Sequence, residues 1–174
     1  MWDLGSNTGF FSRIASDMGI QTLAFDQDPA SVERNYRTSV SRKEANLLPL
    51  VLDLANPSPK IGWANGERMD LVDRGPADML FALALVHHLA IAGNVPLGMI
   101  AEFFSKLCSR AVVEFVAKGD PKAARLLATR EDIFPTYTQD DFETEFSRFF
   151  EIISVHRITD SQRTIYLMRA RWAC

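Results

Sequence analysis

Short apolar stretches alternate along the chain with segments whose apolar side chains recur at helical spacing. Five of these stretches predict β-strands: residues 1–4, 22–25, 50–52, 79–85 and 111–116. Strands that alternate with helices are typical of a parallel sheet with helices on both faces. Two further stretches, residues 152–155 and 165–168, flank a polar turn and predict a terminal β-hairpin.

The segments between the strands carry recognisable helix signals. The first helix is expected to end before Gly19 and to bury four apolar side chains: Phe11, Ile14, Ala15 and Met18. Asp28-Pro29 and Asp120-Pro121 each pair an N-capping carboxylate with a proline at the first helical position, and another helix opens at Pro96. Thr138–Asp141 is close to a capping box and precedes three phenylalanines that we expect in the core: Phe142, Phe146 and Phe149.

The segment between the third and fourth strands, residues 55–76, begins rich in Pro, Gly and Asn. Its second half, residues 67–73, predicts a short crossover helix.

Composition limits the class of protein. The 174 residues are 47% hydrophobic and 24% charged, which is typical of one globular domain over residues 1–174. The net charge of −3 argues against binding nucleic acid through bulk charge. The longest apolar run, Met79–Val86, is too short to span a membrane, and we expect no signal peptide. Cys108 and Cys174 form neither a metal-ligand spacing nor a disulfide framework, so a reducing cytosol is the simplest compartment.

The turn after the first strand is the first candidate site. Gly5 and Gly9 allow a sharp turn and the close approach of a ligand, although an ordinary β-to-α turn explains them equally well. The dinucleotide fingerprint G-x-G-x-x-G is absent, and Asp3 before the turn favours a cationic ligand over a pyrophosphate. Asp26 ends the second strand, where a carboxylate can accept hydrogen bonds from both hydroxyls of a ribose. Helix capping is the alternative for Asp26, but Asp28 already fills that role.

These residues, Asp3–Gly9 followed by Phe25–Pro29, resemble the first two motifs of class I S-adenosylmethionine-dependent methyltransferases. Residues 77–89 resemble the family's fourth strand and the loop after it, and the terminal hairpin is similar to its antiparallel strands. The resemblance implies a three-layer α/β/α, Rossmann-like fold with a mostly parallel seven-stranded sheet. Pro59–Trp63, Glu67-Arg68 and the double histidine are also similar to bacterial methyltransferases related to a nodulation protein.

The resemblance further implies S-adenosylmethionine as cofactor and no metal. Cofactor contacts are then expected from the turns after the first four strands: Asp3, Gly5, Asn7, Gly9, Asp26, Gln27, Asp53, Leu54 and Ala82. The family places an adenine-contacting acid at the position of Asp53. It also has several residues of first strand, and a helix, before the position of Asp3, so we expect the domain to lack N-terminal residues of a longer protein.

Methyl transfer by in-line displacement needs a base only when the acceptor must lose a proton. His87 and His88 follow the fourth strand and are candidates for that base, although a capping or packing role is the alternative. Glu114 is a carboxylate inside an apolar strand, so it needs a partner and is a further catalytic candidate. We expect the acceptor pocket to be bordered by these residues and by the segment around Trp63, with Lys118 and Asp120 close by.

The acceptor itself is not indicated. The N-P-P-Y/F motif of methyltransferases that act on nucleobase amino groups is absent, because residues 82–85 read Ala-Leu-Ala-Leu. The alternatives are a non-catalytic module that binds the cofactor or a partner, and a nicotinamide-dependent oxidoreductase. The glycine spacing and the hairpin disfavour the oxidoreductase.

Overall fold

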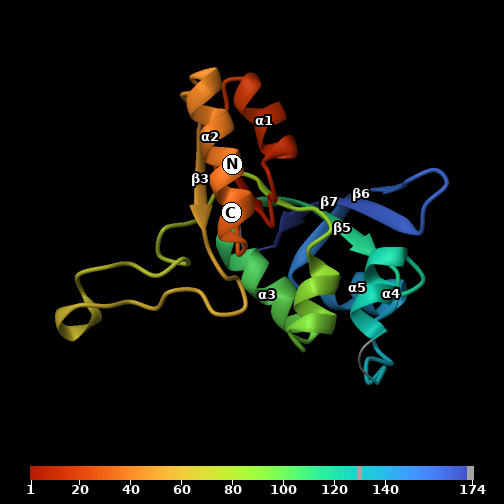
Figure 1. Cartoon of the computed structure of the whole chain (residues 1–174). Helices are drawn as coiled ribbons and strands as arrows, with labels where there is room; N and C mark the ends of the chain where they lie inside the picture. The colour runs from red at the N-terminus through yellow and green to blue at the C-terminus, as the bar shows by residue number, and fades with distance from the viewer. Residues whose placement is uncertain (129–130, 172–174) are drawn as a thin grey trace.

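A seven-stranded sheet forms the centre of the computed structural model, which describes residues 1–128 and 131–171 (Figure 1). The strand order is β3-β2-β1-β4-β5-β7-β6. The five parallel strands are β1 (Trp2–Leu4), β2 (Thr22–Asp26), β3 (Leu47–Val51), β4 (Leu80–Ala82) and β5 (Arg110–Val116). β7 (Arg163–Ala170) runs antiparallel between β5 and β6 (Phe150–Arg157). The predicted fold class is therefore confirmed, and the order excludes an all-parallel dehydrogenase sheet.

Helices cover both faces of the sheet, as Figure 1 shows. α1 (Phe10–Asp17) and α2 (Pro29–Arg42) lie on one side, and α3 (Leu97–Leu107), α4 (Pro121–Leu127) and α5 (Gln139–Ser147) on the other. The predicted caps are confirmed: the side chains of Asp28, Asp120 and Thr138 accept hydrogen bonds from backbone N–H groups in the first turns of α2, α4 and α5.

A cluster of aromatic rings holds α5 against the β5-β7-β6 end of the sheet. Phe142 and Phe146 are fully buried with ring centroids 4.1 Å apart, and Phe142 also contacts Phe115 and Tyr166. Phe149 is only partly buried. Full burial of each phenylalanine contributes about 1.5–3 kcal/mol, so this cluster anchors the half of the sheet that carries the hairpin.

The predicted packing face of α1 is wrong. Phe11, Ile14 and Met18 are 48%, 51% and 74% exposed, and only Ala15 of the four expected side chains is buried. α1 instead faces the sheet with small side chains, because Ser12 donates a hydrogen bond to the buried Asp3 carboxylate and draws that side of the helix inward.

The predicted crossover helix at residues 67–73 is also wrong. Most of residues 55–76 forms an extended arm that projects from the body of the molecule (Figure 1), and the chain returns to the core at the buried Leu71. The arm's regular structure is a short 3₁₀ turn, η1 (Trp63–Asn65), and one bridge between Ile61 and Arg68. Two strand limits also differ from the prediction, since β3 begins at Leu47 and β4 ends at Ala82. Pro49 is tolerated because β3 is an edge strand.

Candidate functional site

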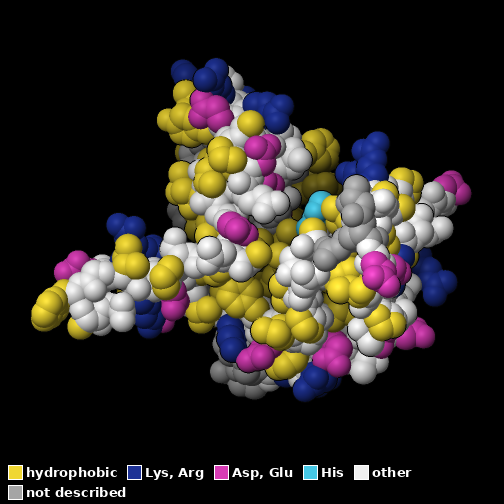
Figure 2. Space-filling view, turned by 60° about the horizontal axis from the view of Figure 1, so that its bottom comes forward, with side chains coloured by type: hydrophobic (Ala, Val, Ile, Leu, Met, Phe, Trp, Pro, Cys, Tyr) yellow, Lys and Arg dark blue, Asp and Glu magenta, His cyan; other side chains and the backbone are white. Residues whose placement is uncertain are grey.

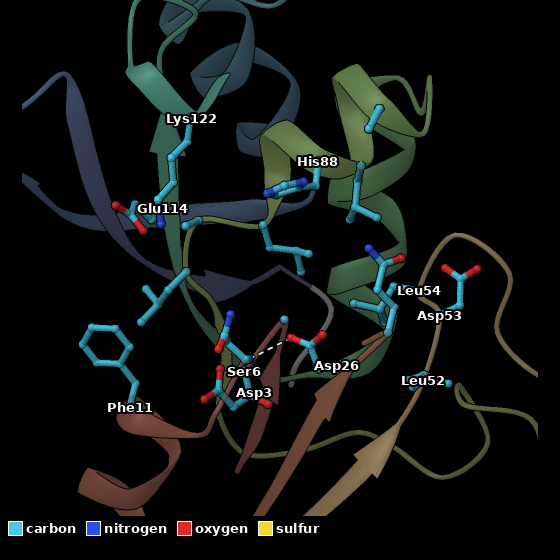
Figure 3. Close-up of a pocket in the computed structure, with 18 of the residues that line it drawn as sticks. Asp3, Ser6, Phe11, Asp26, Leu52, Asp53, Leu54, His88, Glu114 and Lys122 are labelled. Carbon is cyan, nitrogen blue, oxygen red and sulfur yellow. Dashed lines mark hydrogen bonds between the residues drawn. The ribbon is translucent and has the colours of Figure 1, made fainter. Parts of the chain in front are cut away.

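A pocket of about 800 Å³ opens at the carboxyl ends of the parallel strands (Figure 3). Residues after β1, β2, β3 and β4 contribute to its wall, together with residues of β5, α4 and β7. This is where an open α/β sheet places its ligand site, since the strand order reverses direction there.

The turn after β1 is fixed by hydrogen bonds to β2. Gly5 and Ser6 both donate their backbone N–H to the carbonyl oxygen of Phe25, at 2.8 and 2.9 Å. Gly5 has φ 72°, Asn7 has φ 51° and Gly9 has φ 79°, so the chain passes three times through the left-handed region before α1 begins. Ser6 lines the pocket, and its hydroxyl is buried with no hydrogen-bond partner among the described residues.

The carboxylate of Asp26 links the turn after β1 to the turn after β2 through hydrogen bonds. Its Oδ2 accepts the backbone N–H of Asn7 at 2.7 Å (Figure 3), and its Oδ1 accepts the N–H of Asp28 at 2.9 Å. The carboxylate is half-buried and lines the pocket. Each oxygen keeps a further lone pair, so Asp26 can still accept hydrogen bonds from a ligand.

Asp3 is 3% exposed at the base of the pocket. Burial raises the pKa of Asp3 to about 6 from its ordinary value of 3.8, and the charge of Asp26 adds to this increase. The hydrogen bond from Ser12 opposes it. A cationic ligand beside Asp3 would favour the ionised carboxylate.

The structure brings most of the expected cofactor residues together. Seven of them line the pocket: Asp3, Gly5, Asn7, Asp26, Gln27, Asp53 and Leu54. Gly9 and Ala82 do not. Ala82 is fully buried in β4, and a Cβ on Gly9 would collide with the buried side chain of Asn35 rather than with a ligand.

The two histidines have different positions. His88 begins the π-helical turn η2 (His88–Ala92) and lines the pocket, whereas His87 is fully buried and does not. Both ring nitrogens of His87 lack a hydrogen-bond partner among the described residues. Burial, together with the positive charges of its neighbours, lowers the pKa of His87 to about 4. Of the two predicted candidates, only His88 can therefore reach a bound acceptor.

His88 is exposed at the pocket, but its ring is desolvated enough to lower its pKa below the ordinary value of 6.5. The positive charge of Lys122, which lines the same pocket, lowers that pKa further. Because its pKa is lowered, the imidazole of His88 is neutral at neutral pH and can accept a proton.

Glu114 has the partner that its burial requires. Its Oε1 accepts a hydrogen bond from Arg163 at 3.1 Å, and the same guanidinium makes two further bonds to Asp120, at 2.7 and 3.0 Å. Glu114 and Arg163 line the pocket, whereas Asp120 lies behind them and holds Arg163 in place.

Two expected neighbours lie elsewhere. Lys118 points away to Asp132 and to the carbonyl oxygen of Phe134, and it does not line the pocket. Trp63 is 87% exposed on the arm, so the expected border around Trp63 is wrong. The arm carries the segment out into solvent because residues 55–76 form no helix that could pack on the sheet.

Several pocket residues were not identified from the sequence, among them Ser6, Phe11, Lys122 and Arg163. Arg163 could have been found, because Glu114 in an apolar strand demands a cation and the antiparallel hairpin places Arg163 opposite Val116. Lys122 gives no such signal, since its position depends on how α4 packs against η2.

Neither a metal cluster nor a membrane-spanning helix occurs among the described residues. No group of three or more His, Cys, Asp or Glu side chains there could hold a metal ion. Likewise, none of the helices within the described ranges has the length and apolar character needed to cross a membrane.

Comparison with known proteins places this geometry in context. No protein-family model matches the chain. It is 41% identical over 165 residues to nodulation protein NoeA of Rhizobium meliloti (strain 1021), covering 94% of the chain and 34% of NoeA. The chain thus spans about a third of the length of this relative.

Solved structures agree on the fold. A SAM-dependent methyltransferase from Aquifex aeolicus matches 97% of the chain and 81% of its own, with a TM-score of 0.63 and 14% identity. Magnesium protoporphyrin IX methyltransferase (ChlM) from Synechocystis PCC 6803 with bound SAM matches 97% of the chain and 68% of its own, with a TM-score of 0.64 and 15% identity. The resemblance to class I methyltransferases is confirmed for the fold, and the resemblance to nodulation-protein relatives is confirmed by NoeA.

Proposed function

We propose that this chain, a relative of NoeA with the class I methyltransferase fold, binds S-adenosylmethionine and transfers its methyl group to an acceptor. The observation that carries the proposal is the pocket at the carboxyl ends of the strands, with Asp3 and Asp26 on its wall. When bound, the cofactor supplies a methyl carbon on a positively charged sulfur: an acceptor lone pair bonds to that carbon, the C–S bond breaks, and its electron pair stays on sulfur.

The residues of the pocket fit this cofactor. Asp26 has free lone pairs for the ribose hydroxyls, and Asp3 provides negative charge for the cationic amino-acid end. The buried Ser6 hydroxyl, which has no partner among the described residues, would gain one from a polar ligand. Asp53 and Leu54 follow β3 and are the proposed contacts for the adenine.

We assign the proton-accepting role to His88. It lines the pocket, and the desolvation of its ring and the charge of Lys122 keep its imidazole neutral. Glu114 is less suited to this role, because its charge is engaged by Arg163, so we propose that Glu114 shapes the pocket by fixing that guanidinium.

Calorimetric titration tests the cofactor. S-adenosylhomocysteine should bind and NAD should not. Asp26→Ala should weaken binding by about 1.5–3 kcal/mol, the worth of hydrogen bonds to a charged group. Asp17→Ala, which removes an exposed acid at the end of α1, is the matched control and should leave affinity unchanged.

Since Asp26 also holds two backbone N–H groups, Asp26→Asn serves as a second variant of the same size, and circular dichroism checks the fold of both. Binding of NAD in place of S-adenosylhomocysteine, or unchanged affinity in both folded variants, contradicts the proposal.

Turnover separates an enzyme from a non-catalytic module. The chain is incubated with S-adenosylmethionine carrying a tritiated methyl group and with fractions of a bacterial extract. Label that appears in a fraction, and disappears in the Asp26 variants, identifies a methyltransferase. Cofactor binding with no transfer to any fraction favours the module.

A further inference from the structure

The charges on the pocket wall are divided between its two sides. Three carboxylates, those of Asp3, Asp26 and Asp53, stand at the ends of β1, β2 and β3. The two cations of the wall, Lys122 and Arg163, stand on the opposite side, on α4 and β7. Figure 3 shows Lys122 and His88 facing Asp26 across the pocket. A ligand that fills the pocket therefore meets acids at one end and a cation at the other.

Arg163 is not available to a ligand as a free charge. Its Nε and Nη2 donate to Asp120, and its Nη1 donates to Glu114. The side chain is only 20% exposed. These contacts balance the charge of Arg163 with two carboxylates, of which that of Glu114 also lines the pocket.

Lys122 is different. It makes no ion pair within the part of the chain that the structure describes, and its side chain is exposed where it lines the pocket. α4 packs against η2, so Lys122 and His88 line the same side of the pocket, close enough for the charge of Lys122 to lower the pKa of His88. The ammonium and the imidazole consequently face the same space, opposite the acidic end.

An ammonium beside a neutral imidazole suits one kind of methyl acceptor. The ammonium stabilises negative charge on an oxygen, and the imidazole accepts the proton of a hydroxyl. A protonated amine would be repelled by Lys122, and the carboxylate on this side of the pocket, that of Glu114, is already paired with Arg163. On the basis of the function proposed above, we propose that the acceptor presents an oxygen to Lys122 and His88 and that this oxygen is methylated.

In the proposed methyl transfer, each proton and electron pair has a defined destination. The hydroxyl proton goes to the imidazole of His88, and an oxygen lone pair forms the new C–O bond. The C–S bond breaks with its electrons on sulfur, and Lys122 stabilises the charge that develops on oxygen. The charged and titratable groups that face His88 are Lys122, Asp26 and the buried ring of His87, with Arg163, Glu114 and Asp120 behind them.

Small probes test the proposal in the chain saturated with S-adenosylhomocysteine. Acetate and inorganic phosphate represent oxygen ligands, and ethylammonium represents an amine. NMR signals of the His88 ring and the Lys122 side chain report binding. We expect both oxyanions to bind in the millimolar range and ethylammonium not to bind. Lys122→Gln should weaken oxyanion binding at least about fivefold, whereas Lys122→Arg should retain most of it.

Lys106→Gln is the matched control. Lys106 pairs with Glu102 on α3, away from the pocket, and its replacement should leave oxyanion binding unchanged. Binding of ethylammonium at comparable affinity, or oxyanion binding that Lys122→Gln does not weaken, overturns the oxygen acceptor. The cofactor proposal fails separately, if S-adenosylhomocysteine itself does not bind in the preceding titration.

Discussion

His87 and His88 are adjacent in sequence, yet they differ in burial and in access to the pocket. The chain leaves β4 through Ala84, whose φ of 50° turns it sharply toward η2. That turn buries His87 completely and leaves His88 in the pocket, with the two rings 4.3 Å apart. The sequence predicted a histidine at this site, but it could not decide which of the two, because the choice depends on the backbone turn after β4 and on the packing around it.

The two rings should titrate separately. His87 should titrate near pH 4, because burial is the main cause of its lowered pKa. His88 should titrate below its ordinary value of 6.5, and Lys122→Gln should raise its pKa only part of the way back, since desolvation is the larger cause. NMR of the ring protons measures both, with His87→Gln and His88→Gln providing assignments. A His88 pKa that does not respond to Lys122→Gln would contradict the electrostatic contact between α4 and η2.

Other single residues show the same limit of sequence reasoning. Asp3 and Asp26 were expected in the site because they end adjacent parallel strands, and the structure places both on the pocket wall. Gly9 and Ala82 were included by the same resemblance but do not reach the pocket. A motif gives the position of a residue along the chain, whereas the direction of its side chain depends on packing.

At the scale of elements, α1 shows how a correct helix can have an incorrectly predicted face. The periodicity of Phe11, Ile14 and Met18 correctly indicates a helix. The face that packs is formed instead by Ser12, Ala15 and Ser16, and Ser12 donates a hydrogen bond to the buried Asp3 carboxylate. Periodicity alone does not distinguish an apolar face that packs on the sheet from one that stays exposed.

Both ends of α1 use a glycine with positive φ, and this offers a matched pair of substitutions. Gly9 has φ 79° and Gly19 has φ 81°, so alanine is strained at both. A Cβ at Gly19 meets nothing within 4 Å, whereas one at Gly9 collides with Asn35, which Arg13 holds by a hydrogen bond. Gly19→Ala should cost about 1 kcal/mol of unfolding free energy, and Gly9→Ala about 2–3 kcal/mol.

Urea unfolding of the two variants measures the difference directly. If the two variants lose the same unfolding free energy, the backbone torsion accounts for both losses. The collision of the new Cβ with Asn35 then adds nothing to the loss in Gly9→Ala. If Gly9→Ala loses cofactor binding while keeping its stability, the glycine contacts the ligand after all.

For the whole molecule, the strands of the sheet and the terminal hairpin were predictable from the sequence, and the arm was not. Each strand was recognised from its own apolar run, and the antiparallel hairpin completes the sheet. The arm contradicts the rule that a crossover between parallel strands packs on the sheet. Figure 2 shows it projecting from the body with hydrophobic side chains on its surface. Within this segment Trp63 and Met69 are 87% and 60% exposed. Its Pro and Gly content indicated irregular structure, but nothing local to the segment gives its direction.

Two buried groups, His87 and Asp3, should make the unfolding free energy of the molecule depend on pH in opposite directions. His87 is neutral in the folded chain and has a pKa of about 4, below its ordinary value of 6.5. The unfolded chain therefore binds this proton more readily, and stability falls as the pH drops from about 6.5 to about 4. Asp3 has a folded pKa of about 6, above its ordinary value of 3.8. The folded chain binds this proton more readily, so stability rises as the pH drops from about 6 to about 3.8.

Single substitutions should therefore separate two effects that oppose each other in the wild type. Each shift of about two pKa units corresponds to about 3 kcal/mol. From pH 7 to pH 4, the stability of Asp3→Asn relative to wild type should fall by about 2–3 kcal/mol, and that of His87→Leu should rise by a similar amount. Urea unfolding at fixed ionic strength measures both, and the double variant is the internal control because its profile should run parallel to that of the wild type. Profiles of the single variants that already run parallel to the wild type would show that neither group is buried as the structure describes.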